Sequence, residues 1–391
     1  MKMRRRLFSI GLLCITWATG SYSQNSLPAE PVPDNSVEAA VNWFPVRIRF
    51  GPSGDWAVVN FCSYRSPTLC RLVRWDLKGA SQEIGPNLKS TGHWTLIAGQ
   101  MPGKSYMWPA VAWHSNRVAF VASDCRREVN TGTERTVCET SEGELVVSDS
   151  LSDIRAGNVL PVSGVNRLAW RPDDQALIYW RAEPPVQLAS GRRLASPDVY
   201  EFDTADGIER FMSGAISWRA EYRGPFYAPD GRTFALCGFG MRVPVALQLQ
   251  ALVQCVQVDR ERPMQVSALN PERLAQVFNY VVADAKDGRW LVLGDRLRLV
   301  RKDSFDQPVD LINLRTPEGH SKNIAPVDTD VSVRGDVAVV NDTWFAYNRP
   351  IPRNRYWRSD LAAPPFPVLT IFVKEEGAIL PVIWPDVDRM K

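Results

Sequence analysis

The residue types that most often carry catalysis are sparse in this chain of 391 residues. Only three histidines occur, His93, His114 and His320, and their wide spacing argues against a His-based metal site or general base. The sequence contains no Gly-x-Ser-x-Gly nucleophile elbow and no His-Glu-x-x-His zinc helix. We therefore predict no catalytic residue, no metal ion and no cofactor, and an enzymatic role is the less favoured interpretation.

The first 23 residues have the features of a secretory signal peptide. A basic start (residues 2–6) precedes an apolar run (residues 7–20) and small residues suited to cleavage before Gln24. This segment holds four of the 46 basic residues and no acid, so the net charge of +3 becomes about −1 in the mature chain. That balance gives no electrostatic case for binding nucleic acid. No later apolar run is long enough for stable membrane insertion, and a periplasmic or secreted protein is expected.

A turn motif recurs along the mature chain. In residues 227–236 an aromatic strand end is followed by a Pro-Asp-Gly turn and a second apolar strand. Proline presets φ, aspartate can accept a hydrogen bond from the backbone ahead of it, and glycine tolerates positive φ. The equivalent positions are 63, 57, 57 and 57 residues apart, and they are Phe50, Trp113, Trp170, Tyr227 and Asp284. A fixed period with β-type flanks predicts sheets arranged around an axis, as in a propeller.

This period predicts an all-β fold, a six-bladed β-propeller whose blades are stapled by local disulfides. A seven-bladed ring, with residues 368–384 as an extra hairpin, is the alternative. The expected organisation is a signal peptide (1–23), a leader (24–44) and a single propeller domain (45–391). Residues 37–43 are the candidate for a closing strand, because propellers often pair an N-terminal strand with the last blade.

The cysteines indicate disulfides. Six remain after the signal peptide, in three local pairs: Cys62 with Cys70, Cys125 with Cys138, and Cys237 with Cys255. An even number in an exported chain is typical of disulfide bonding, and each pair brackets the loop between the second and third strand of its unit. Buried free thiols are the alternative, and metal binding is disfavoured because no Cys-x-x-Cys spacing occurs.

The turn motifs also resemble a known family. Pro172-Asp173-Asp174 and Pro229-Asp230-Gly231, each after an aromatic strand end, are similar to the PD40 (WD40-like) repeats of TolB-like six-bladed propellers. The resemblance covers most of the mature chain, although only two units keep the full Pro-Asp pair. It implies a toroid with a central channel and a periplasmic location. TolB also carries an N-terminal α/β domain that we do not expect here, so its partner-binding role is not carried over.

Carboxylates are the remaining candidates for chemistry, because the first strands of different blades converge on the channel. Glu221, Asp284, Asp328 and Asp330 would lie there. Asp284 is the first to examine, since it takes an anchor position that is otherwise aromatic. Its alternative interpretation is a turn acid that caps the following loop.

Binding is the better-supported role. Loops that lead into first strands surround one mouth of a propeller, and here they are rich in aromatic residues and arginine, the types enriched at interface hot spots. The predicted binding residues are Tyr106, Trp108, Trp218, Arg219, Glu221, Tyr222, Arg223 and Asp284. Packing between blades is the alternative role for each aromatic side chain.

The sequence therefore predicts an exported, monomeric propeller that binds a protein partner in the cell envelope through loops at one mouth. The alternative is a channel-site enzyme, a lyase or hydrolase, or a small-ligand binder acting on saccharide or peptide.

Overall fold

The computed structural model is built almost entirely of antiparallel strands. It describes residues 43–63, 66, 68–77, 82–83, 89–90, 92–99, 103–130, 133–139, 143–151, 154, 157–181, 186–187, 193–194, 198–212, 222–244, 250–264, 266–268, 280–285, 289–293, 296–301, 309–313, 326–341, 368–373, 378–382 and 387–390. The chain divides into two units, residues 1–35 and 36–391, and all described residues belong to the second. Within them, no helix has the length and apolar character needed to cross a bilayer.

The strands form successive sheets, each from a contiguous part of the chain. The first two sheets are β1 (Trp43–Phe50), β2 (Trp56–Ser63), β3 (Cys70–Asp76) and β6 (His93–Ala98), then β7 (Lys104–Val111), β8 (Val118–Asn130), β10 (Glu144–Ser148) and β11 (Asn158–Ser163) with β9 (Thr133–Cys138) on β8. The next two are β12 (Val165–Trp170), β13 (Ala176–Arg181), β16 (Asp198–Asp203) and β17 (Glu209–Phe211), then β18 (Tyr222–Tyr227), β19 (Thr233–Pro244), β20 (Gln250–Asp259) and β21 (Val266–Ala268).

The remaining sheets complete the series. They are β22 (Tyr280–Ala285), β23 (Arg289–Leu293), β24 (Arg296–Arg301) and β25 (Val309–Asn313), then β26 (Pro326–Val331), β27 (Val337–Asn341), β28 (Val368–Val373) and β29 (Ala378–Pro381). Two short hairpins stand apart, β4 (Gln82–Glu83) with β5 (Lys89–Ser90) and β14 (Val186–Gln187) with β15 (Arg193–Leu194). A 3₁₀ turn, η4 (Val387–Arg389), follows the last sheet.

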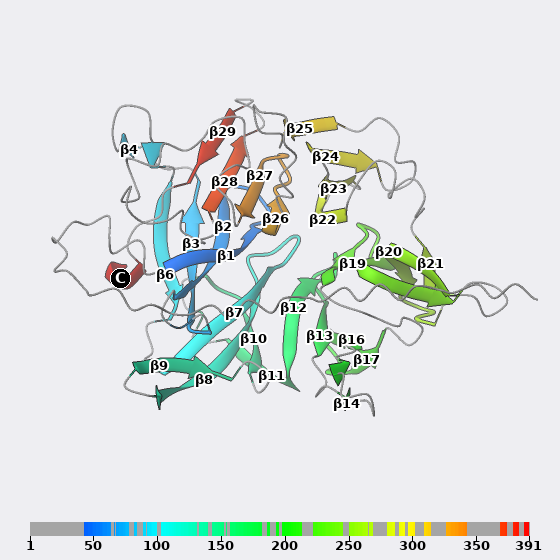
Figure 1. The fold of residues 1–391 in the computed structure, drawn as a ribbon, viewed down its shortest axis with the longest axis horizontal. Helices are drawn as coiled ribbons and strands as arrows, with labels where there is room; N and C mark the ends of the chain where they lie inside the picture. The colour runs from blue at the N-terminus through cyan, green and yellow to red at the C-terminus, as the bar shows by residue number, and fades with distance from the viewer. Residues whose placement is uncertain are drawn as a thin grey trace, which may run out of the picture. The chain divides into compact units, whose positions relative to one another are not determined.

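The first strand of every sheet lies innermost. β1, β7, β12, β18, β22 and β26 contact one another in that order, and β26 contacts β1 again. Figure 1 shows the sheets following one another around this common centre. The arrangement is that of an all-β propeller.

Buried side chains fill the spaces between neighbouring sheets. β2 (WAVVNFCS) and β13 (ALIYWR) are buried along nearly their whole length, because each second strand has a sheet packed on both of its faces. The anchor tryptophans link sheets as well. Trp113 Nε1 donates to the Trp170 carbonyl at 3.0 Å, and Trp170 Nε1 donates to the Ala110 carbonyl at 3.1 Å. The aromatic anchors of the repeat therefore serve packing between blades.

The acids of the turns have the predicted capping role. Asp173 Oδ1 accepts a hydrogen bond from Gln175 N at 3.0 Å, and Asp230 Oδ1 accepts one from Arg232 N at 2.9 Å. Asp174 reaches the preceding blade, where its carboxylate accepts the backbone N–H groups of Trp113 and His114 at 2.6 and 3.0 Å. His114 is thus an exposed turn residue, as the repeat predicts.

The ring closes through side chains. Asp328 accepts a hydrogen bond from Ile48 N at 2.9 Å and pairs with Arg49 at 2.6 Å, and Asp330 accepts from Phe50 N at 2.7 Å. The end of the chain adds a second tie, because Asp388 of η4 pairs with Arg71 and accepts from Trp43 Nε1.

The fold-class prediction needs correction. We expected a six-bladed propeller, or alternatively a seven-bladed one, whose blades are stapled by local disulfides, with residues 37–43 as the candidate for a closing strand. The described strands do not repeat one regular blade in that way: the second sheet has five strands, and β28 and β29 complete the sheet of β26 instead of forming a further blade. Among the described strands, none from the N-terminal end joins that last sheet. A sequence period marks recurring turns, and it cannot reveal a hairpin inserted between them.

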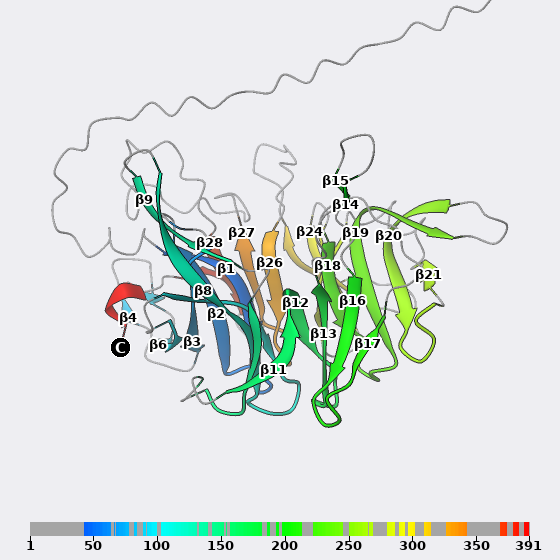
Figure 2. The same cartoon turned by 90° about the horizontal axis from the view of Figure 1, so that it is seen from below.

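Two of the predicted disulfides are present, Cys62–Cys70 and Cys125–Cys138. In both, the cysteines lie directly opposite each other across a hairpin. Figure 2 shows that the β8–β9 ribbon lies on the same side as the β14–β15 hairpin and the far ends of β19 and β20, opposite the β16–β17 turn. We call this side, where the β8–β9 ribbon and the β14–β15 hairpin lie, the insertion face, and the opposite side the turn face. The bridges therefore fix the bases of hairpins on the insertion face.

We expect a third bridge, between Cys237 and Cys255. These residues occupy opposing positions in the β19–β20 register, as the two bonded pairs do in theirs. Mass mapping of non-reduced peptides should recover a Cys237–Cys255 link. A free Cys237 thiol, or a link from it to any other cysteine, would contradict this prediction.

Candidate functional site

Each innermost strand is interrupted by a β-bulge. The register with the second strand shifts within β1, β7, β12, β18, β22 and β26. In β7, β12 and β18, two residues face one residue of the partner strand, so that the first of the two is displaced from the regular pleat. The bulges of β7 and β12 therefore displace one side chain each from the regular pleat.

Two of these bulges carry strained residues. The first bulge residue is Trp108 in β7 (φ 57°), Arg167 in β12 (φ 52°) and Gly224 in β18 (φ 93°). Glycine adopts positive φ freely, whereas a bulky side chain there costs on the order of 1–3 kcal/mol. Such strain is common at functional sites, which makes Trp108 and Arg167 the first residues to consider.

Both residues belong to one group of side chains. The guanidinium carbon of Arg47 lies 3.4 Å from the Trp108 ring centroid, and that of Arg167 lies 5.7 Å from it. Phe44, Val46 and Trp108 pack against the layer formed by Cys62, Cys70 and Met107. All five residues of this group are half-buried, and we call Phe44, Val46, Arg47, Trp108 and Arg167 the mouth cluster. Because Phe44 pairs with Cys62, the cluster lies toward the insertion face.

The chemistry available to the mouth cluster is recognition. It combines aromatic and aliphatic surface with two guanidinium groups, the composition typical of interface hot spots. The described residues include no group of three or more His, Cys, Asp or Glu side chains suited to hold a metal ion.

Of the predicted binding residues, the structure assigns Trp108 to this cluster and Tyr106 elsewhere. Tyr106 lies in β7 and is only 5% exposed, with its ring 5.9 Å from Phe120 in the core. The side chain of Tyr106 therefore has the alternative role, packing between blades. Trp218, Arg219 and Glu221 lie outside the described residues. The backbones of Tyr222 and Arg223 begin β18, and Asp284 opposes Trp290 in β22, but their side chains lie outside what is described.

Sequence reasoning missed Phe44, Val46, Arg47 and Arg167. Arg167 and Gly224 each precede their anchor aromatic by three residues. Gly224 thus occupies the position that Arg167 has in the preceding repeat. A glycine at this position is the sequence signal that could have indicated a bulge. The acids Asp328 and Asp330, considered as channel acids, instead hold the ring closed.

Arg167 offers a direct test of the bulge strain. At φ 52° glycine is the unstrained residue, so Arg167→Gly should be more stable than Arg167→Ala by about 1 kcal/mol. Both variants lose the same guanidinium contact, so their difference isolates the backbone. Urea unfolding of the two proteins measures it. Greater stability of the alanine variant, the usual order inside a strand, would contradict a strained bulge.

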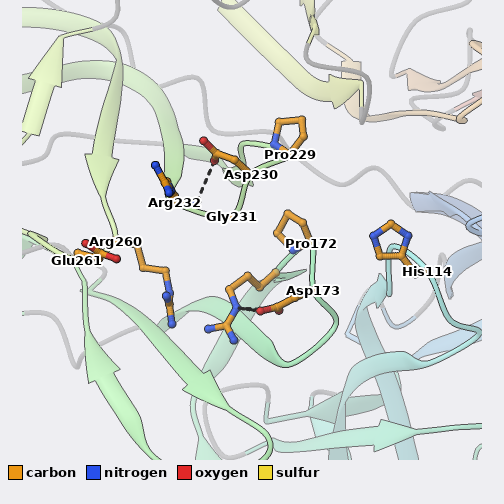
Figure 3. Close-up of a pocket in the computed structure, with 10 residues that line it drawn as sticks. His114, Pro172, Asp173, Pro229, Asp230, Gly231, Arg232, Arg260 and Glu261 are labelled. Carbon is orange, nitrogen blue, oxygen red and sulfur yellow. Dashed lines mark hydrogen bonds and ion pairs between the residues drawn. The ribbon is translucent and has the colours of Figure 1, made fainter.

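A pocket of about 300 Å³ lies on the turn face (Figure 3). Its walls are the turns of neighbouring blades, and they contain His114, Arg171, Pro172, Asp173, Pro229, Asp230, Gly231, Arg232, Arg260 and Glu261. Three arginines and three carboxylates line it, so the pocket has no excess of either charge for selecting an ion.

Beneath this pocket lies a buried carboxylate, Glu201, which is 1% exposed. Arg260 Nε lies 2.8 Å from both of its oxygens, Arg171 Nη1 lies 3.1 Å from Oε1, and the Tyr227 hydroxyl donates to Oε2. Burial, followed by the charge of Glu201 and this hydrogen bond, raises the pKa of Tyr227 well above its usual range. The hydrogen bond to Glu201 raises the pKa of Arg260. Since both oxygens are engaged, Glu201 is a structural acid that joins two blades.

No family model and no curated protein matches this chain. Several solved structures are similar to it. TolB from Acinetobacter baumannii shares 12% identity at a TM-score of 0.48, with 86% of this chain and 65% of that chain covered. A puromycin-hydrolysing peptidase from Mycobacterium tuberculosis shares 14% at 0.45, with 92% and 55% covered, and the β-propeller domain of the Trilobed protease from Pyrococcus furiosus shares 13% at 0.45, with 88% and 96% covered.

The chain spans just under two thirds of the length of that TolB and about half of that peptidase. At such identities the likeness concerns the fold alone, and membership of the PD40 repeat family stays a prediction. By its own strand topology the chain is an all-β propeller.

Proposed function

We propose that this chain is an exported propeller that binds a protein partner in the cell envelope through the mouth cluster. The observation that carries the proposal is the strained pair Trp108 and Arg167. Both adopt positive φ, and together with Arg47 they form a half-buried cation–aromatic group near the axis. Phe44 and Val46 add apolar surface beside them. Aromatic and arginine side chains on rigid strands bind a partner at low entropic cost.

Export is supported by the signal-like first 23 residues and by the two disulfides, which persist in oxidising compartments. A periplasmic location follows if the source is a Gram-negative bacterium. Intact-mass measurement of the secreted protein should give a chain that begins at Gln24. A chain that retains residues 1–23 in the cytosol would contradict export.

A channel enzyme is the competing function, and the described acids favour it less. Asp328 and Asp330 each accept a backbone N–H of β1, and Asp328 also pairs with Arg49, so both serve ring closure. A general acid or base needs a free proton site at the substrate. Binding by a monomeric propeller is accordingly the function that we propose.

Crosslinking followed by affinity capture from the envelope fraction tests the proposal. Wild-type protein should recover a defined partner, and Phe44→Ala/Trp108→Ala should recover at least ~10-fold less, the loss expected for hot-spot residues. Phe211→Ala is the matched control, because Phe211 is an exposed aromatic residue (44%) on the outer strand β17. Equal recovery by all three proteins, or no partner for the wild type, would overturn the proposal.

A further inference from the structure

The two disulfides differ in their surroundings. Cys62 and Cys70 close the loop between β2 and β3 and are 5% and 0% exposed, and we call their disulfide the inner bridge. Cys125 and Cys138 close the base of the β8–β9 ribbon, and we call their disulfide the outer bridge. Cys138 is buried and Cys125 is half-buried. The outer bridge is therefore the more accessible of the two.

The mouth cluster packs on the inner bridge, because three of its members contact the layer that contains both cysteines. Ser105, which is 0% exposed, ties β7 to the same loop. Its hydroxyl accepts a hydrogen bond from Cys70 N at 2.8 Å and donates one to the Thr68 carbonyl at 2.7 Å. Since β7 also carries Trp108, the position of that ring depends on the loop that the inner bridge closes.

The base of the ribbon is hydrogen-bonded to this loop as well. Ser66 Oγ accepts the N–H of Thr136 at 3.0 Å. Thr68 Oγ1 accepts the N–H of Cys138, a cysteine of the outer bridge, also at 3.0 Å. Ser66 and Thr68 both lie between the two cysteines of the inner bridge. The two bridges and the mouth cluster thus form one connected unit.

The ribbon depends on its bridge for support. Among the described strands, β8 pairs with β9 alone beyond Asp124, since β7 and β10 pair with its earlier residues. An isolated two-stranded hairpin is only marginally stable in water, and a disulfide at its base restricts its open form. Without the outer bridge the ribbon opens more often, and each opening withdraws two N–H groups from Ser66 and Thr68.

We propose that the outer bridge is a redox-sensitive latch of the mouth cluster. Reduction by a dithiol detaches the ribbon from the inner-bridge loop, and the mouth cluster loses the fixed arrangement that binds the partner. This inference rests on the proposed binding function and adds the regulation of that same site.

The exchange balances with the dithiol as the only reactant. A thiolate of the dithiol attacks Cys125 Sγ, the bond to Cys138 Sγ breaks, and a mixed disulfide forms. The second sulfur of the dithiol then displaces Cys125. The dithiol ends as a disulfide, and its two electrons and two protons pass to the thiols of Cys125 and Cys138. The inner bridge reacts more slowly because both of its cysteines are buried.

Stepwise reduction of the mature protein with dithiothreitol tests the order of the two bridges. Alkylation followed by peptide mass mapping should show Cys125 and Cys138 labelled at least ~10-fold faster than Cys62 and Cys70. Hydrogen exchange should then become faster at residues 62–70 and 104–108, because the loop has lost its contacts with β9. Equal labelling rates, or earlier reduction of the inner bridge, would overturn the proposal.

Envelope capture tests the consequence for binding. Cys125→Ser/Cys138→Ser permanently lacks the outer bridge and should recover at least ~10-fold less partner than the oxidised wild type. Thr68→Val keeps both bridges but removes the acceptor of the Cys138 N–H, so its recovery should fall between the two. Thr204→Val is the matched control, because the Thr204 hydroxyl donates to the Gln175 carbonyl of another blade at 2.7 Å. It should recover as much partner as the wild type, and circular dichroism verifies the fold of each variant.

The outcomes separate the latch from the binding function. If capture depends on Phe44 and Trp108 but is unchanged in Cys125→Ser/Cys138→Ser, the binding function stands and the latch is overturned. If the wild type captures no partner, the binding function fails and hydrogen exchange alone decides the latch. Exchange at residues 62–70 and 104–108 that is faster in this variant then supports it, and unchanged exchange overturns it.

Discussion

Glu201→Ala is expected to lower the free energy of unfolding by about 3–5 kcal/mol, the cost of removing one partner from a buried ion pair. Glu201 is 1% exposed, and it neutralises Arg171 and Arg260, whose side chains are 8% and 24% exposed. Its loss also leaves the buried Tyr227 hydroxyl without its acceptor. Glu201→Gln keeps an acceptor oxygen and should lose less. Urea unfolding at neutral pH measures these changes.

The control for this experiment is an exposed ion pair in the same sheet. Asp206 lies 3.9 Å from Arg210, and both side chains are more than 40% exposed. Asp206→Ala should therefore change stability by less than ~0.5 kcal/mol. If Glu201→Ala remained within that margin of the wild type, the network would have no structural role, and the turn-face pocket above it would become a functional candidate.

Asp328→Ala should destabilise the fold by about 2–4 kcal/mol, because it removes the acceptor of a buried backbone N–H and the partner of Arg49. Asp328 is 8% exposed and links the last sheet to Ile48 and Arg49 of the first. The nearby charges of Asp328 and Asp330 raise the pKa of Arg49 against the effect of its burial, so this guanidinium stays charged and would be left unpaired. Denaturant unfolding measures the loss, and limited proteolysis should show faster cleavage near β1 and β26.

Asp149→Ala serves as the comparison, because Asp149 pairs with Arg117 while its own side chain is 72% exposed. A loss below ~0.5 kcal/mol is expected there. Equal stability of the Asp328 and Asp149 variants would show that the ring is held closed by other contacts, such as Asp388 with Arg71 and Trp43.

The elements that sequence could predict are those encoded by neighbouring residues. The Pro-Asp turns, the aromatic anchors and the cysteine pairs each depend on a few adjacent positions or on one hairpin, and the structure places Asp173, Trp170 and Cys62–Cys70 as predicted. A turn requires particular residue types at adjacent positions, so its place can be predicted from the sequence alone.

The elements that sequence could not predict depend on contacts between distant strands. The bulge that turns Trp108 toward Arg47 is a property of two paired strands, and nothing in Tyr106-Met107-Trp108 separates the buried ring of Tyr106 from the half-exposed ring of Trp108. The β8–β9 ribbon could not be predicted either, because an extra strand inserted within a repeat leaves the flanking turn motifs unchanged. Ring closure by Asp328 joins residues 280 positions apart.

Each sheet of this propeller is made from one uninterrupted stretch of chain. The two disulfides are equally local, because their cysteines are only 8 and 13 residues apart in the sequence. A chain that emerges gradually, from a ribosome or a translocation pore, can thus complete and oxidise one sheet before the next has appeared. Among the described strands, no early one has to wait unpaired for a partner strand from a distant part of the chain, which limits exposed strand edges during synthesis. Only the final docking of the last sheet and η4 onto the first requires the whole polypeptide, so assembly should proceed vectorially and end in a single late event.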